Sequence, residues 1–164
     1  MNETETVSES SRSLRRTRQA SLCEVVQGLT EIHVRLADHY SLAAQGAVHE
    51  RVGLVMEFLA AHERSLVEYL QRFMKEAPTK VLDRRFKYVP DLFGDDLLAL
   101  LAQREIRNAE ELAELVQEIH GAIDAVYAPL NGSSLPEELE EFVDKLRLQE
   151  REHLITQIRA IMDE

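Results

Sequence analysis

The chain has 164 residues, of which 45% are hydrophobic and only 5% aromatic, and its formal net charge is −11. This length suffices for one domain with a buried core, and the abundance of Leu, Ala, Glu and Arg is typical of helices. The acidic balance argues against nucleic acid or an anionic membrane as a partner, and no apolar run is long enough to span a bilayer. The single cysteine, Cys23, excludes an internal disulfide and a cysteine-built zinc site, and it is typical of a cytoplasmic protein.

Residues 1–20 form a polar segment with four arginines and few apolar side chains. Such a composition cannot build a core, so we predict a disordered tail. The segment has no apolar centre and is therefore not a secretory signal. A tail of this kind can order when it binds, which makes it a candidate docking segment for a protein partner.

Two helices are predicted to follow in quick succession. Ser21 and Glu24 have the spacing of a capping box, and apolar residues then recur at alternating steps of three and four. This pattern predicts a helix over about 21–45 that ends near Gly46. The same alternation predicts a second helix over about 48–75. Because the connection is short, the two helices should be antiparallel neighbours.

The second half of the chain predicts a long connection and two more helices. Two prolines and a glycine interrupt the periodicity in residues 76–94, which we expect to cross the length of the bundle and pack on its outside. Helices are predicted over about 95–127 and about 136–162. Residues 21–164 are thus predicted to form one all-α domain, an antiparallel four-helix bundle with a long crossover between the second and third helices. We detect no internal repeat.

Metal-ligating side chains occur on or beside the inner stripe of every predicted helix. In chain order these candidates are His33, His62, Glu105, Glu111, Glu150 and His153. Imidazole and carboxylate together suit iron, manganese or zinc. The spacing of Glu150 and His153 directs both side chains towards one place. His62 and Glu150 each fall near the middle of the bundle, so one shared central metal site is predicted.

Alternatives remain open for several of these residues. Helix one offers His39 on its inner stripe and His33 beside the stripe, and His33 is the nearer of the two to the height of His62. On the third helix, Glu111 has the better height, whereas Glu105 has the better rotational phase. A histidine on an apolar face is often only a hydrogen-bonded core residue. A glutamate beside the apolar stripe, such as Glu111, is often simply exposed to solvent.

The segments "QEREHL" and "FLAAHERSL" give residues 21–162 a resemblance to the ferritin-like superfamily, which includes bacterioferritins and rubrerythrins. The resemblance implies a dimetal site at mid-bundle, with one Glu from each of helices one and three and a Glu-x-x-His from each of helices two and four. Glu150 and His153 match the fourth-helix motif, and His62 falls on the histidine of the second. Leu59 stands where that second motif has its Glu, and helix one has no Glu on its inner stripe.

Two functions follow as hypotheses. The first is a ferritin-like metal-binding protein with a mid-bundle site of mixed His and Glu ligands. Such a protein would have weak redox activity and would associate through its helix faces into a homo-oligomer. The second is a non-enzymatic helical interaction module with a degenerate metal site and a docking N-terminal tail. The sequence does not decide whether the protein is an enzyme.

Overall fold

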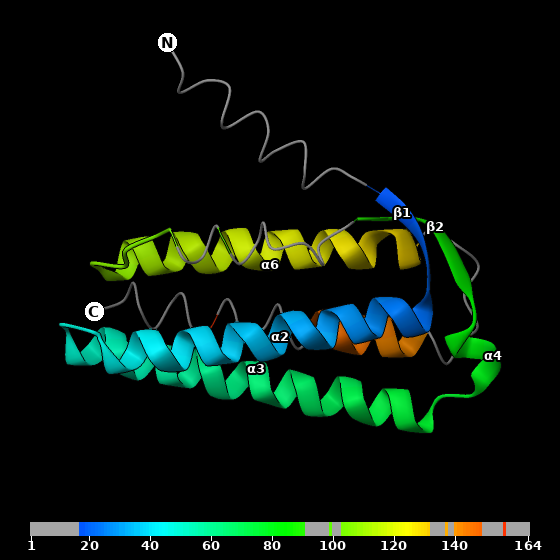
Figure 1. Ribbon diagram of the computed structural model, residues 1–164, viewed down its shortest axis with the longest axis horizontal. Helices are drawn as coiled ribbons and strands as arrows, with labels where there is room; N and C mark the ends of the chain where they lie inside the picture. The colour runs from blue at the N-terminus through cyan, green and yellow to red at the C-terminus, as the bar shows by residue number, and fades with distance from the viewer. Residues whose placement is uncertain are drawn as a thin grey trace, which may run out of the picture.

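A computed structural model describes residues 17–90, 99, 103–131, 137, 140–148 and 156. The described residues are mostly helical, and they add a small two-stranded sheet to the predicted all-α composition. The long helices α2 (Leu22–Gln45), α3 (Glu50–Glu76) and α6 (Ala109–Asn131) extend along the same direction, and the sheet lies at one end of them (Figure 1). None of the described helices is both long and apolar enough to cross a membrane.

Helices α2 and α3 form the predicted antiparallel pair. The Ser21 hydroxyl accepts a hydrogen bond from the Glu24 amide at 3.1 Å, as the capping signature predicts, and Gly46 caps the other end of α2. Helix α3 begins close to this turn, where Gly53 is buried. A Cβ atom at Gly53 would lie 3.3 Å from the Ala44 carbonyl oxygen, so the glycine permits the close approach of the two helices.

The connection after α3 is more regular than predicted. It contains the short helix α4 (Thr79–Leu82) and the strand β2 (Arg85–Pro90), which pairs antiparallel with β1 (Thr17–Ser21). Residues 17–20 were predicted to be disordered, so that boundary was wrong; residues 1–16 lie outside the described residues. Burial explains the pairing: Ala20, Phe86 and Val89 face the core, and β2 also contacts α6.

The helix predicted over 95–127 is not continuous. Residues 103–108 are not helical, and α6 begins at Ala109 and extends to Asn131. Its start is fixed by Asn108, whose side-chain oxygen accepts a hydrogen bond from the Glu111 amide at 2.9 Å. The Glu111 carboxylate in turn accepts one from the Arg107 amide at 2.7 Å. These two hydrogen bonds satisfy the amide groups of Glu111 and Arg107 and so stabilise the point where the loop passes into the helix.

Residues 140–148 are helical and lie within the predicted fourth helix. Phe142 stacks on Phe73 of α3 with ring centroids 3.6 Å apart, and Val143 and Leu146 are fully buried. Arg147 donates hydrogen bonds to both carboxylate oxygens of Asp124 in α6, at 3.0 and 3.2 Å. This segment therefore packs against both α3 and α6. Glu150 and His153 lie outside the described residues.

Candidate functional site

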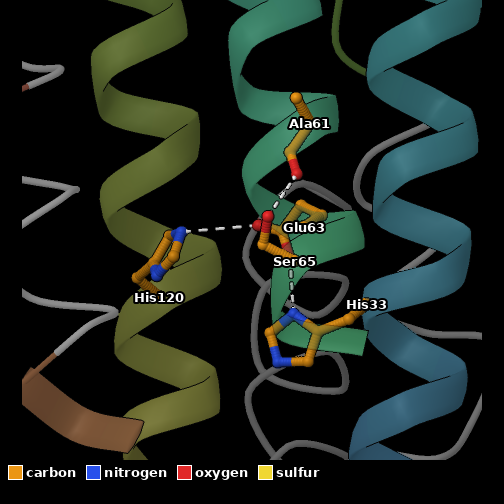
Figure 2. A network of polar contacts seen from close by, with 5 residues as sticks. All are labelled: His33, Ala61, Glu63, Ser65 and His120. Atoms are coloured by element: carbon orange, nitrogen blue, oxygen red, sulfur yellow. Dashed lines mark hydrogen bonds and ion pairs between the residues drawn. The ribbon is translucent and has the colours of Figure 1, made fainter. Parts of the chain in front are cut away.

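A buried carboxylate, Glu63 of α3, is the centre of the candidate site. Its Oε2 accepts a hydrogen bond from Nδ1 of His33 in α2, and both side chains have 0% exposure. Its Oε1 lies 3.8 Å from Nε2 of His120 in α6, whose side chain is only 6% exposed. Figure 2 shows the two imidazoles approaching the carboxylate from different sides. The contacts around Glu63 thus join side chains of three helices.

The apolar pattern of α3 explains why Glu63 points inwards. Met56, Leu59, Leu66 and Leu70 are all buried, and Glu63 occupies the step between Leu59 and Leu66 in the same stripe. Sequence analysis placed this stripe on His62 instead, because either residue gives an alternation of three and four between the two leucines. His62 is also buried, at 8% exposure, on the neighbouring edge of the stripe.

The electrostatics of the site keep Glu63 ionised. Burial favours the neutral acid and raises its pKa, but the hydrogen bond from His33 and the positive potential of His33, His120 and His62 act in the opposite sense. Together these imidazoles hold the pKa of Glu63 below its ordinary value. The site is therefore an anionic carboxylate compensated by surrounding imidazoles, as a buried charge requires.

Tyr40 of α2 is the fourth polar group near this carboxylate. Its side chain has 0% exposure, and its hydroxyl has no hydrogen-bond partner among the described residues. Burial, together with the negative charge of Glu63, raises the pKa of Tyr40 far above its ordinary value. The phenol therefore stays protonated and is available as a hydrogen-bond donor. The Glu63 Oε1 atom likewise accepts no hydrogen bond within the described part of the chain.

Of the predicted site residues that the structure describes, two lie beside Glu63 and two lie away from it. His33 and His62 are both buried beside Glu63, and their assignment as metal ligands stays a prediction. Glu105 was predicted as a ligand, but its side chain is 82% exposed and pairs with Arg107. Glu111 caps the first turn of α6, about 13 Å along the helix from His120. Both were assigned from a continuous third helix, which residues 103–108 interrupt.

Two central residues, Glu63 and His120, were not predicted. One signal for His120 is a short repeat: "EIHVRLADHY" begins at Glu31 and "EIHGAIDAVY" at Glu118. In both, Glu-Ile-His is followed by six residues and a tyrosine, so His33 corresponds to His120 and Tyr40 to Tyr127. All four of these side chains are buried. The prediction that the chain has no internal repeat was therefore wrong for this motif.

The side chains of the site are of the kinds that bind transition-metal ions. Carboxylate and imidazole are ligands of iron, manganese and zinc, and Glu63 presents a buried oxygen that accepts no hydrogen bond from the described residues. Within the described ranges, however, no group of three or more His, Cys, Asp or Glu side chains is arranged to hold a metal ion. A complete site would need donors from elsewhere in the chain.

Comparisons with protein-family models, with curated proteins and with solved structures gave no match to this chain.

Proposed function

We propose that this chain is a metal-binding helical protein of ferritin-like, four-helix-bundle architecture. Iron, manganese or zinc would be held at mid-bundle by Glu63, with His33 and His120 as candidate donors and further donors from the fourth helix. The observation that carries the proposal is the ionised, fully buried Glu63 carboxylate, which lies between imidazoles from two other helices.

Energetics support a functional role for this cluster. Replacing a buried ionic cluster by apolar side chains of similar volume is often neutral or stabilising, so a core does not need such groups for stability. Groups of this kind at the centre of a fold are candidates for chemistry. A cation would interact with the negative carboxylate and with neutral imidazole nitrogens, because metal ligands bind in their deprotonated forms.

The fourth helix would complete the ligand set. The offset that relates His33 to His120 in the repeat also relates Glu63 to Glu150, so Glu150 is the expected carboxylate of the second half. His153, three residues later, would point towards the same place on a helix. His62, buried beside Glu63, is a further candidate donor.

Within this proposal the chain's own residues have separate tasks. Glu63 and the imidazoles bind and orient, and the leucines around them exclude water from the site. Tyr40 keeps its proton, because burial and the charge of Glu63 raise its pKa. Bound iron or manganese would supply redox chemistry, and bound zinc would supply a Lewis acid.

A thermal-shift experiment tests the proposal. A ligand that binds only the folded state stabilises that state by about 2.7 kcal/mol when the free ligand concentration is about one hundred times the Kd. This stabilisation corresponds to a rise in Tm of about 5–10 °C for a chain of this size. We expect Fe²⁺, Mn²⁺ or Zn²⁺ to give such a rise over EDTA-treated protein. Glu63→Gln, which keeps the shape of the side chain and removes its charge, should abolish the rise.

Glu68→Gln is the matched control, because Glu68 is an exposed residue of the same helix. It should respond to metal as the native protein does. An equal rise in Tm for Glu63→Gln and Glu68→Gln would place metal binding elsewhere on the acidic chain and contradict the proposal.

A further inference from the structure

The two ends of the described helices carry opposite charge. Figure 1 shows the sheet at one end and the turn from α2 into α3 at the other. In the sequence of the sheet end, residues 17–21 and 79–90, Asp83 is the single acid among five basic residues: Arg18, Lys80, Arg84, Arg85 and Lys87. Residues 104–107 lie beside the turn, because both segments line one cavity. This loop and the first turns of α6, residues 103–114, carry two arginines and four glutamates: Glu105, Glu110, Glu111 and Glu114.

An aromatic side chain is exposed at the basic end. Tyr88 of β2 is 70% exposed, although Phe86 and Val89 of the same strand are buried. The neighbouring Lys87 is exposed as well. Tyrosine is enriched at protein interfaces, where it is often the anchor that fills a pocket of the partner. Tyr88 is therefore suited to contact another protein surface while Lys87 meets negative charge.

A cavity at the acidic end has the properties of a pocket for such an anchor. Its volume is about 600 Å³, and its lining includes apolar side chains from both helices, the turn and the loop: Ala43, Val48, Val52, Met56 and Ile106. Val48 is 93% exposed, so apolar surface is open to solvent here. The volume lies in the range of pockets that enclose a ligand. It is sufficient for a phenol ring and part of its strand.

The side chain of Tyr88 cannot reach the cavity of its own chain. β1 pairs with β2 and leads directly into α2 at Leu22, whereas the cavity lies beside Ala43 at the other end of that helix. At 1.5 Å per residue these two points are about 30 Å apart. An occupant with a basic, tyrosine-bearing surface is, however, available in a second copy of the chain.

We propose that copies of this chain associate head to tail, with Tyr88 of one copy in the cavity of the next. Lys87 and Arg85 then lie near the glutamates of the loop and of α6, and this complementarity orients the two surfaces. The contact is heterologous, so each copy keeps one free end, and assembly continues into a ring or a filament. No metal takes part, and the inference is independent of the proposed function.

Sedimentation velocity of the full chain in EDTA tests the association. We expect the native protein to associate as its concentration rises, and to do so less at high salt, which screens the charges. Tyr88→Ala should weaken association by about thirtyfold, as the loss of an interface anchor does. Phe58→Ala is the matched control, because Phe58 is an exposed aromatic residue on the side of α3, at 54% exposure. It should associate as the native protein does.

A second variant blocks the cavity end. Gly46 lines the cavity, its φ is −95°, and a Cβ atom there would meet only the Ala43 carbonyl oxygen, at 4.0 Å. Gly46→Arg should therefore fold, and its long cationic side chain should obstruct the cavity and repel the basic end. Gly121→Arg is the matched control, since a Cβ atom at Gly121 meets nothing within 4 Å and the position is exposed. This control should associate normally.

Mixing the two blocked variants gives the decisive result. Gly46→Arg and Tyr88→Ala should each be monomeric, but an equimolar mixture should form a dimer and nothing larger, because each variant keeps one intact end. Native protein that stays monomeric, or a mixture that does, would overturn the inference. Association that is lost in Phe58→Ala and kept in Tyr88→Ala would assign the contact to helix faces and overturn it too. If Tyr88→Ala does not fold, Lys87→Glu replaces it as the block of the sheet end.

Discussion

Replacing Glu63 by alanine should destabilise the protein much more than any exposed substitution on the same helix. The side chain has 0% exposure and accepts a hydrogen bond from His33. Loss of its charge-assisted hydrogen bond costs about 2 kcal/mol, and loss of a buried methylene adds about 1 kcal/mol. Because the buried imidazoles of His33 and His120 also lose their counter-charge, we expect a total loss of about 3–5 kcal/mol.

The assay is thermal or urea unfolding followed by circular dichroism, at pH 7 and in EDTA so that no metal contributes. The expected loss corresponds to a fall in Tm of about 10 °C for a chain of this size. Glu68→Ala, at an exposed position of α3, should change stability by no more than about 0.5 kcal/mol. If Glu63→Ala is as stable as Glu68→Ala, Glu63 does not form the buried cluster described above and the reasoning is refuted.

Three further predictions concern pH, packing and capping. Folding lowers the pKa of Glu63, so the ionised carboxylate stabilises the protein at pH values above its ordinary pKa of 4.5, and this stabilisation is lost as the pH falls below 4.5. The Tm of the native protein should therefore fall more steeply in acid than the Tm of Glu63→Gln. Parallel curves of Tm against pH would contradict this prediction. Phe142→Ala should cost about 3 kcal/mol in urea unfolding, because Phe142 stacks on Phe73; an unchanged midpoint would show that residues 140–148 do not pack on α3. Asn108→Ala should cost about 1 kcal/mol, while Asn108→Asp, which retains the cap oxygen, should stay near native stability.

Periodicity and capping predicted α2 and α3 well because their signals are local. Ser21 with Glu24 and the apolar steps that follow are sufficient to specify α2. The strand pair was not predictable in this way, since β1 and β2 are far apart in sequence and are stabilised by each other and by the core. The end of the loop before α6 depended on Asn108, a polar cap that periodicity alone does not reveal.

The candidate site was only partly predicted for a similar reason. His62 was singled out because an imidazole on an apolar stripe stands out, and His33 because it lies near the height of His62. Glu63 was missed because glutamate is usually solvated, and nothing local to α3 shows that an imidazole from α2 compensates it. The long-range contact with His33 allows Glu63 to be buried beside His62, and the sequence of one helix does not contain that information.

The measurement that tests the central claim most directly is elemental analysis of the full-length, untagged protein, purified alongside Glu63→Gln and Glu68→Gln. The account predicts stoichiometric iron, manganese or zinc in the native protein and in Glu68→Gln, and its loss in Glu63→Gln with the helical content unchanged. Metal-free native protein, or the same metal content in all three proteins, would contradict it.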